Sequence, residues 1–286
     1  MKIAFIDKKN AQLKVENRTL KVDEQKIPLR LIDTIVLASS CQFESRDMVK
    51  IANEGITILL LSGRGDSVAL VQSGVSKSAE LKLAQYQAQG RALEVAKYFL
   101  SHKIKYHVEH LRQHEIALDV FETLEHVENA ETLERLLGIE GSFSKRYFSE
   151  YFALFSKRLH QGKRSRNPPQ DPVNAMMSFL YMMMYNFITI RLLSFGFEPG
   201  IGFLHKPFRS HNALASDFME LFRADVNALV FRLLDEKLLE SSDFSKRNGV
   251  YLRYEARKKI WEEVKAFNTS MQTKLDTHIA NIRSML

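Results

Sequence analysis

The sequence predicts an α+β protein in which a β-rich domain, residues 1–75, precedes a larger α-helical domain, residues 76–286. Apolar and polar residues alternate, or form short apolar runs, throughout the first 75 residues, and both patterns are typical of strands. From about Lys77 onward, apolar residues recur with the helical period instead. The small and polar segment 73–76 separates the two patterns and predicts the domain boundary.

The N-terminal elements follow one another closely. A helix is expected at 45–53, with Gly55 as its stop signal. A turn is expected at 63–66, where two glycines flank Arg64. Strands are expected at 2–6, 12–16, 19–22, 27–30, 34–37, 56–61 and 67–71.

The second part of the chain predicts helices joined by short connections. Strand-like alternation returns there only at 250–252. Helices are expected at 78–116, 118–137, 142–161, 173–195, 214–236 and 253–284.

Composition excludes several classes of protein. With 45% hydrophobic residues and a mean hydropathy of -0.22, the 286-residue chain is neither disordered nor collagen-like. A single cysteine, Cys41, excludes a disulfide scaffold and a cysteine-based zinc cluster. The longest apolar stretch, 176–190, is interrupted by polar residues and is too short for a membrane span, and the N-terminus lacks a signal-peptide pattern. We therefore expect a soluble, cytoplasmic protein.

The net charge of +7 is unevenly distributed. Segment 121–140 carries six Glu against one Arg, and segment 141–170 carries seven Lys and Arg against one Glu. Within the basic segment, the run Lys163 to Pro169 favours a loop that contacts phosphate, and Tyr147 and Tyr151 could stack on bases. A solvated surface loop is the alternative.

Three places carry candidate catalytic residues. Glu140 lies between two glycines at an expected helix junction, His205 ends the glycine-rich segment 199–205, and Asp217 and Glu220 lie three residues apart on one helix face. Each has a structural explanation when taken alone: a solvated turn, a packing or capping histidine, or an acid that complements a helix dipole. Together, carboxylates and one imidazole form a ligand set for Mg²⁺ or Mn²⁺, which phosphodiester chemistry uses.

These residues lie in motifs that resemble the CRISPR-associated adaptation integrase family, the metal-dependent DNA endonucleases that insert new spacers into CRISPR arrays. The order and spacing of the motifs match from about residue 138 to 265, and the N-terminal strands also resemble the family. The matching segments are 138–141, 146–148, 166–169, 171–176, 180–181, 185–186, 199–205, 214–223 and 248–252.

The resemblance implies a site and its partners. It implies Glu140, His205 and Glu220 as ligands of Mg²⁺ or Mn²⁺, with Asp217 as a further catalytic acid. It also implies homodimerisation through the β domain, and a complex with a small CRISPR-associated protein, as a heterohexamer, on double-stranded DNA. Together with the basic tract, it predicts DNA contacts from Arg146, Lys163, Arg164, Arg166, Tyr181, Tyr185 and Arg223.

The chain departs from the family pattern in two places. Ala224 stands where the family commonly has proline, and segment 103–107 lacks the family's frequent Asn-Gln pair. On the same expected helix, His107, His110 and His114 share a face, and we expect a surface or DNA-facing role for them rather than a metal site.

Two alternatives to the spacer integrase remain open. A transposon-type integrase of the same superfamily would use the same acids and histidine. A non-catalytic DNA-binding scaffold would use the acids only as structural caps.

Overall fold

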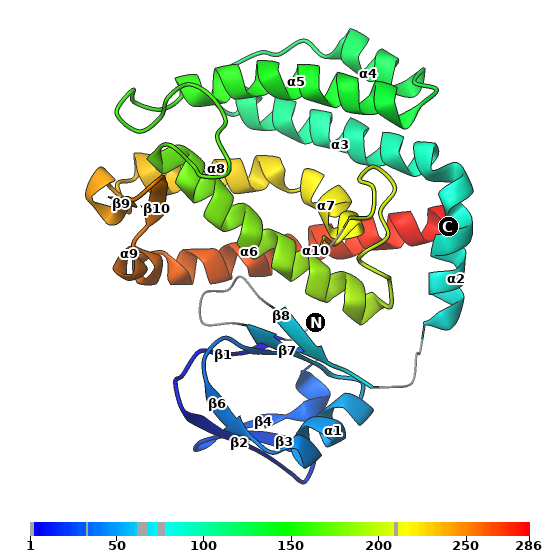
Figure 1. Ribbon diagram of the computed structural model, residues 1–286, viewed down its shortest axis with the longest axis vertical. Coiled ribbons are helices and arrows are strands. Elements are labelled where there is room, and N and C mark those ends of the chain that lie inside the picture. The colour runs from blue at the N-terminus through cyan, green and yellow to red at the C-terminus, as the bar shows by residue number, and fades with distance from the viewer. Residues whose placement is uncertain (1–2, 33, 62–67, 74–77, 209–210) are drawn as a thin grey trace. The chain divides into compact units, whose positions relative to one another are not determined.

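The computed structural model describes residues 3–32, 34–61, 68–73, 78–208 and 211–286, which form two units (Figure 1). Residues up to Ala79, together with 193–197, form the first unit, and the remaining residues form the second. The predicted α+β class is confirmed, because β structure precedes a helical region. The predicted boundary at 75/76 and the turn at 63–66 lie outside the described residues.

The first unit contains two four-stranded sheets. In the first sheet, β1, β5 and β7 are parallel and β8 is antiparallel to β7. In the second sheet, β2, β3 and β4 are antiparallel neighbours and β6 is parallel to β2. The strand order in the first sheet is β1 (Ile3–Ile6), β5 (Thr34–Leu37), β7 (Thr57–Leu61) and β8 (Val68–Val71). The strand order in the second sheet is β4 (Gln25–Pro28), β3 (Thr19–Val22), β2 (Ala11–Glu16) and β6 (Cys41–Phe43).

Both sheets contribute to one hydrophobic core. In β2, Ala11, Leu13 and Val15 are buried and alternate with polar residues, as the sequence predicts for a half-buried strand. Helix α1 (Ser45–Asn53) contributes Ile51 to this core and is fastened to β2, since the Asp47 carboxylate accepts the Val15 N–H at 2.8 Å.

Two details of this unit differ from the prediction. The strand expected at 27–30 ends at Pro28, and a 3-10 turn follows at Leu29–Leu31. Strand β6 was not predicted, because three residues are too few to show an alternation; its pairing with β2 defines it.

The second unit is helical and is organised around α3 (Ala92–Arg112). Apolar residues of α3 are buried at three- and four-residue spacings, and α4, α5, α7 and α8 all pack against it. The other helices are α2 (Ala79–Gln87), α4 (Phe121–Glu128), α5 (Leu133–Ala153), α6 (Pro172–Phe195), α7 (Ala213–Glu220), α8 (Arg223–Asp235), α9 (Tyr254–Lys259) and α10 (Trp261–Met285). Figure 1 shows α3 and α5 side by side.

The expected helix junction at Glu140 is wrong. Helix α5 continues through Gly138 and Gly141, so Glu140 projects from the middle of a helix. Glycine lowers helix propensity by only about 1 kcal/mol per residue, and the packing of Ile139 and Phe143 outweighs that cost.

Other helix boundaries differ because breaks interrupt the periodic pattern. A 3-10 turn separates α2 from α3, and Leu221 and Phe222 separate α7 from α8. The helix expected over 142–161 ends at Ala153. From Leu154 to Asp171 the chain forms a loop, which lies beside a hairpin of β9 (Phe244–Lys246) and β10 (Val250–Leu252). The Val250 N–H donates to the Pro169 carbonyl at 2.7 Å and joins the loop to the hairpin.

Helix α6 is the one helix in the described part of the chain that is long and apolar enough to cross a membrane. Within its most apolar window, 61% is buried inside the protein, and Val173, Met176 and Leu192 are each almost fully buried. These features are those of a core helix.

Candidate active site

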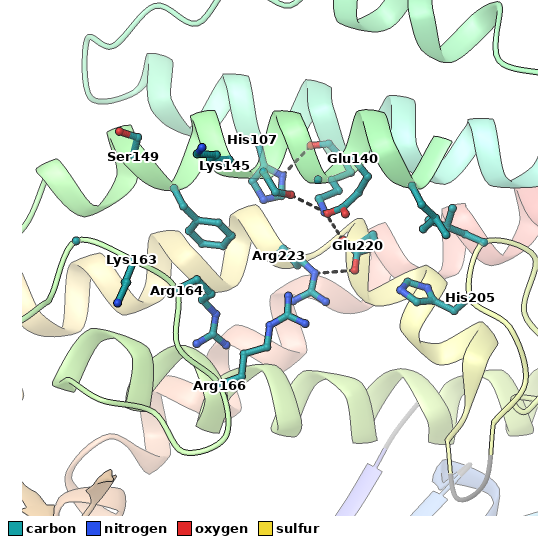
Figure 2. A pocket seen from close by; sticks show the side chains of 17 residues that line it. His107, Glu140, Lys145, Ser149, Lys163, Arg164, Arg166, His205, Glu220 and Arg223 are labelled. Atoms are coloured by element: carbon teal, nitrogen blue, oxygen red, sulfur yellow. Dashed lines mark hydrogen bonds and ion pairs between the residues drawn. The ribbon is translucent and has the colours of Figure 1, made fainter. Parts of the chain in front are cut away.

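A cavity of about 560 Å³ lies in the helical unit and brings together polar and charged residues from five parts of the chain. Figure 2 shows its side chains, with Glu220 and Arg223 beside Glu140, and His205 on the opposite side from Lys163 and Arg164. The polar and charged lining residues are Lys103, His107, Glu140, Ser144, Lys145, Ser149, Lys163, Arg164, Arg166, His205, Glu220 and Arg223.

Helix α3 supplies a buried lysine at the centre of this group. Lys103 is 2% exposed, and its ammonium forms ion pairs with Glu140 of α5 and with Oε2 of Glu220 on α7, the latter at 2.6 Å. The sequence motifs did not single out Lys103. Its signal was a lysine on the apolar face of an amphipathic helix, a position that a lysine occupies only when it is paired.

Both glutamates are held as carboxylates. Burial alone would raise the pKa of Glu220, but the adjacent Arg223 and Lys103 outweigh it and hold this pKa far below its ordinary value. The same balance applies to Glu140, whose pKa is lowered because Lys103 outweighs the effects of burial and of the Glu220 charge. Ser144 also donates a hydrogen bond to Glu140 Oε1 at 2.7 Å.

His205 is oriented by Asp217. Its Nδ1 donates to Asp217 Oδ1 at 2.7 Å, so Nε2 is the ring nitrogen available to a ligand in the cavity. Burial opposes protonation of His205, but the hydrogen bond and charge of Asp217 raise its pKa. Asp217 itself is fully buried and does not line the cavity.

The carboxylate of Asp217 also fixes the loop that carries His205. It accepts the backbone N–H groups of Phe203, Leu204 and His205 at 2.6, 3.1 and 2.8 Å. Gly202 allows this close approach, because a Cβ there would lie 2.8 Å from Asp217 Oδ2. The glycine-rich segment therefore brings the His205 backbone up to a buried acid on α7.

Arg223 braces Glu220 from the other side. Its Nε donates to Glu220 Oε1 at 2.7 Å, and its guanidinium lies 4.8 Å from the centre of the Tyr181 ring. Tyr181 is almost fully buried and donates its hydroxyl to Asn227 at 2.6 Å. The structure thus places Tyr181 behind the cavity, where it supports Arg223.

Lys163, Arg164 and Arg166 of the basic loop all line the cavity. Lys163 and Arg166 are exposed, whereas Arg164 is half-buried and donates to Asn174 at 2.8 Å. Burial, together with the neighbouring guanidinium groups, lowers the pKa of Arg164 to about 10. This edge of the cavity presents three cationic side chains next to the two carboxylates.

Other predicted DNA-contacting residues lie away from the cavity lining. Arg146 is exposed and donates to the Asp119 carbonyl at 2.7 Å, and the Tyr185 hydroxyl accepts the Asn212 N–H at 2.8 Å. The expectation that Tyr147 and Tyr151 could stack on bases is wrong, because both rings are fully buried.

The expected role of the α3 histidines, at the surface or facing DNA, is wrong in its surface part for two of them. His107 and His110 are 1% and 4% exposed, since this face of α3 packs against α5. Burial lowers the pKa of both, that of His110 to about 4. His107 nevertheless lines the cavity.

The donor set fits a hard divalent cation. Two carboxylates and one imidazole nitrogen suit Mg²⁺ or Mn²⁺, and Glu220 Oε2 is buried without an aligned hydrogen-bond donor despite its ion pair with Lys103. Among the residues that the structure describes, no three His, Cys, Asp or Glu side chains lie close enough together to hold a metal ion as they are placed. The Lys103 ammonium instead joins the two carboxylates.

Oriented carboxylates and an imidazole beside a row of cationic side chains are an arrangement typical of enzymes that act on phosphodiesters. The model of a family described as CRISPR associated protein Cas1 matches residues 2–266. The chain therefore belongs to the Cas1 family, as the sequence motifs predicted.

Individual relatives agree with this assignment. The chain is 30% identical to CRISPR-associated endonuclease Cas1 1 of Thermodesulfovibrio yellowstonii, over 91% of this chain and 89% of the relative. It is also 30% identical to CRISPR-associated endonuclease Cas1 3 of Thermus thermophilus, over 91% and 81%. A Cas1 protein from Thermotoga maritima has the same fold, with a TM-score of 0.83 and 21% identity over 99% of this chain and 96% of that one. A casposase bound to integration product gives a TM-score of 0.73 and 23% identity over 93% and 82%.

Proposed function

We propose that this protein is a divalent-metal-dependent DNA endonuclease and integrase that inserts new spacer DNA into a CRISPR array. The single observation that carries this proposal is that Glu140, Glu220 and the Asp217-oriented His205 line one cavity together with the cationic side chains of Lys163, Arg164 and Arg166. The names of the relatives support it, since they are CRISPR-associated endonucleases.

The cavity residues would have three roles: to bind the metal ion, to position its ligands and to bind the DNA. Glu140, Glu220 and Nε2 of His205 would hold Mg²⁺ or Mn²⁺, and the ion would supply Lewis-acid polarisation of the scissile phosphate. Asp217 fixes the imidazole and its tautomer, and Arg223 holds Glu220 in one orientation. Lys163, Arg164 and Arg166 would bind the DNA backbone and balance the charge that develops at phosphorus.

The reaction is a transesterification. The 3′-hydroxyl oxygen of the incoming DNA forms a bond to phosphorus at the repeat boundary, and the bond from phosphorus to the 3′-oxygen of the repeat strand breaks. One proton leaves the attacking hydroxyl and one reaches the leaving oxygen, so the number of phosphodiester bonds is unchanged. Water in place of the hydroxyl gives nuclease activity.

We propose double-stranded DNA, a second copy of this chain and a small CRISPR-associated protein as partners. Two solved structures with a similar fold are complexes. One is a Cas6-RT-Cas1–Cas2 complex, with a TM-score of 0.72, and the other is a TtCas1–DNA complex, with a TM-score of 0.57. The β unit would form the homodimer, and two such dimers would flank one dimer of the small protein.

Half-site integration of a short DNA fragment into a supercoiled plasmid that carries a CRISPR repeat tests the proposal. We expect strand transfer that requires Mg²⁺ or Mn²⁺ and increases when the small partner is added. DNA binding without nicking or joining, in either metal, would show a scaffold instead.

The likeness to a casposase favours one second candidate, a transposon-type integrase. A plasmid with terminal inverted repeats, compared with the repeat plasmid, separates the two. The spacer integrase targets the repeat boundary, whereas the transposon-type enzyme requires inverted repeats on the donor DNA.

A further inference from the structure

Two of the three proposed metal ligands are already joined by a cation of the protein itself. Lys103 is buried on α3, and its ammonium pairs with Glu140 and with Glu220. A buried ammonium or carboxylate is unfavourable unless it is paired, and two neighbouring carboxylates, here the buried Glu220 and the half-buried Glu140, repel each other unless a positive charge lies between them. Each side of this arrangement therefore compensates the other.

On Glu220, Lys103 contacts the one carboxylate oxygen that Arg223 leaves to a metal ion. Arg223 occupies Oε1 of Glu220, which leaves Oε2 as the free oxygen of this carboxylate, and Lys103 lies 2.6 Å from it. Oε2 has no aligned hydrogen bond to hold the pair in place. On Glu140, Lys103 contacts Oε1, to which Ser144 also donates.

The cavity offers the ammonium a second location. Lys103 lines the same cavity as Arg164 and Arg166, where a DNA phosphate would be bound. A lysine has a flexible stem of four carbons, so its charged end can turn from the carboxylates into this space.

We propose that Lys103 is an exchangeable internal cation that competes with the divalent ion for Glu140 and Glu220. Without the ion, it holds the two acids in position. When the ion binds, the ammonium leaves the carboxylates and faces the DNA backbone. This inference rests on the proposed metal-dependent function, and it assigns Lys103 as a positioning residue.

Calorimetric titration with Mg²⁺ of the wild type and of Lys103→Met tests the exchange. Because the variant has no ammonium to displace, we expect Mg²⁺ to bind about tenfold more tightly, which corresponds to about 1.4 kcal/mol. Mg²⁺ should also raise the melting temperature of Lys103→Met more than that of the wild type. Lys105→Met, the same change at an exposed position of α3, is the matched control and should behave as the wild type.

The outcomes separate the two proposals. Equal or weaker Mg²⁺ binding by Lys103→Met overturns the exchange while leaving the metal site intact. If neither the wild type nor the variants bind Mg²⁺, the metal site of the proposed function is itself overturned.

A measurement on the wild type does not depend on the folding of a variant. Acylation of lysine amines, followed by peptide mass spectrometry, reports how accessible each ammonium is. We expect the labelling of Lys103 to increase several-fold in Mg²⁺, while that of Lys105 stays constant. Unchanged labelling of Lys103 in saturating Mg²⁺ contradicts its displacement.

Discussion

The Nδ1 of His205 lies 2.7 Å from Oδ1 of Asp217, and the same carboxylate accepts the backbone N–H of His205 at 2.8 Å. One buried acid therefore fixes both the position and the tautomer of the imidazole. Because its oxygens are used in this way, Asp217 acts behind His205 and not as a group that faces the cavity.

We predict that Asp217→Asn weakens the proposed site without removing any of its ligands. An amide has one acceptor oxygen where the carboxylate has two, so the loop and the imidazole cannot both be held. Loss of such a partner typically costs about 10- to 100-fold in metal affinity or activity. Strand-transfer rates and Mg²⁺ titration measure it, and Asp225→Asn, which breaks a more exposed ion pair with Lys274, is the control.

Gly202→Ala should lower the free energy of unfolding by about 1–3 kcal/mol, the usual cost of overpacking. The new Cβ would lie 2.8 Å from Asp217 Oδ2, from the His205 carbonyl oxygen and from the Ala213 carbonyl carbon. The matched control is Gly138→Ala, where a Cβ meets nothing within 4 Å in the middle of α5 and should stabilise by about 0.5–1 kcal/mol. Urea unfolding of both variants checks the prediction, and a neutral Gly202→Ala would contradict the close approach.

Stability should fall as the pH decreases from about 6.5 to 4. Burial lowers the pKa of His110 and of His278 to about 4, so the unfolded chain takes up these protons first as the pH falls. Each such histidine contributes up to about 1.4 kcal/mol per pH unit in this window. His278 bridges the hydroxyls of Tyr98 and Tyr106 at 2.6 and 2.9 Å, and a neutral ring does so by donating from one nitrogen and accepting at the other.

Replacement of one histidine tests this assignment. His278→Gln keeps a donor and an acceptor but cannot take up a proton, so the pH slope of its unfolding free energy should be shallower. The exposed His126→Gln should leave the slope of the wild type unchanged. Identical slopes in all three proteins would show that His278 is not buried in its neutral form.

DNA binding should depend on salt through the cationic edge of the cavity. Arg166→Gln should weaken binding and reduce the slope of log K against log salt by about 0.9, the value for one phosphate contact on duplex DNA. Arg112→Gln removes an exposed arginine that is paired with Glu109 outside the cavity lining, and should leave the slope unchanged. Fluorescence anisotropy over a salt series measures both slopes.

Local patterns in the sequence predicted much of the fold. Alternation in 12–16 predicted β2, and the helical period predicted α6 over nearly its full length. The continuous α5 could not be predicted in the same way, because Gly138 and Gly141 are helix breakers locally and only packing against α3 overrides them.

In the candidate site, too, local motifs predicted some features, whereas others depend on tertiary contacts. Glu140, His205 and Glu220 were identified from motifs, and the fold brings all three to one cavity. The role of Asp217 behind His205 and the pairing of Lys103 with both glutamates depend on contacts between residues 12 to 117 positions apart, which no local pattern reports. Tyr147 and Tyr151 were predicted to stack on bases but are buried, because aromatic residues that stand beside basic ones in the sequence can equally belong to a core.

Strand transfer by Glu220→Gln, with Glu134→Gln as the control, tests the central claim most directly. Glu134 is exposed on α5, whereas Glu220 is buried at the centre of the cavity. With Mg²⁺, we predict that the wild type and Glu134→Gln join a DNA fragment to a repeat plasmid, that Glu220→Gln does not, and that EDTA stops the reaction in both active proteins. Full strand transfer by Glu220→Gln, or by the wild type in EDTA, would contradict a metal-dependent centre built on this carboxylate.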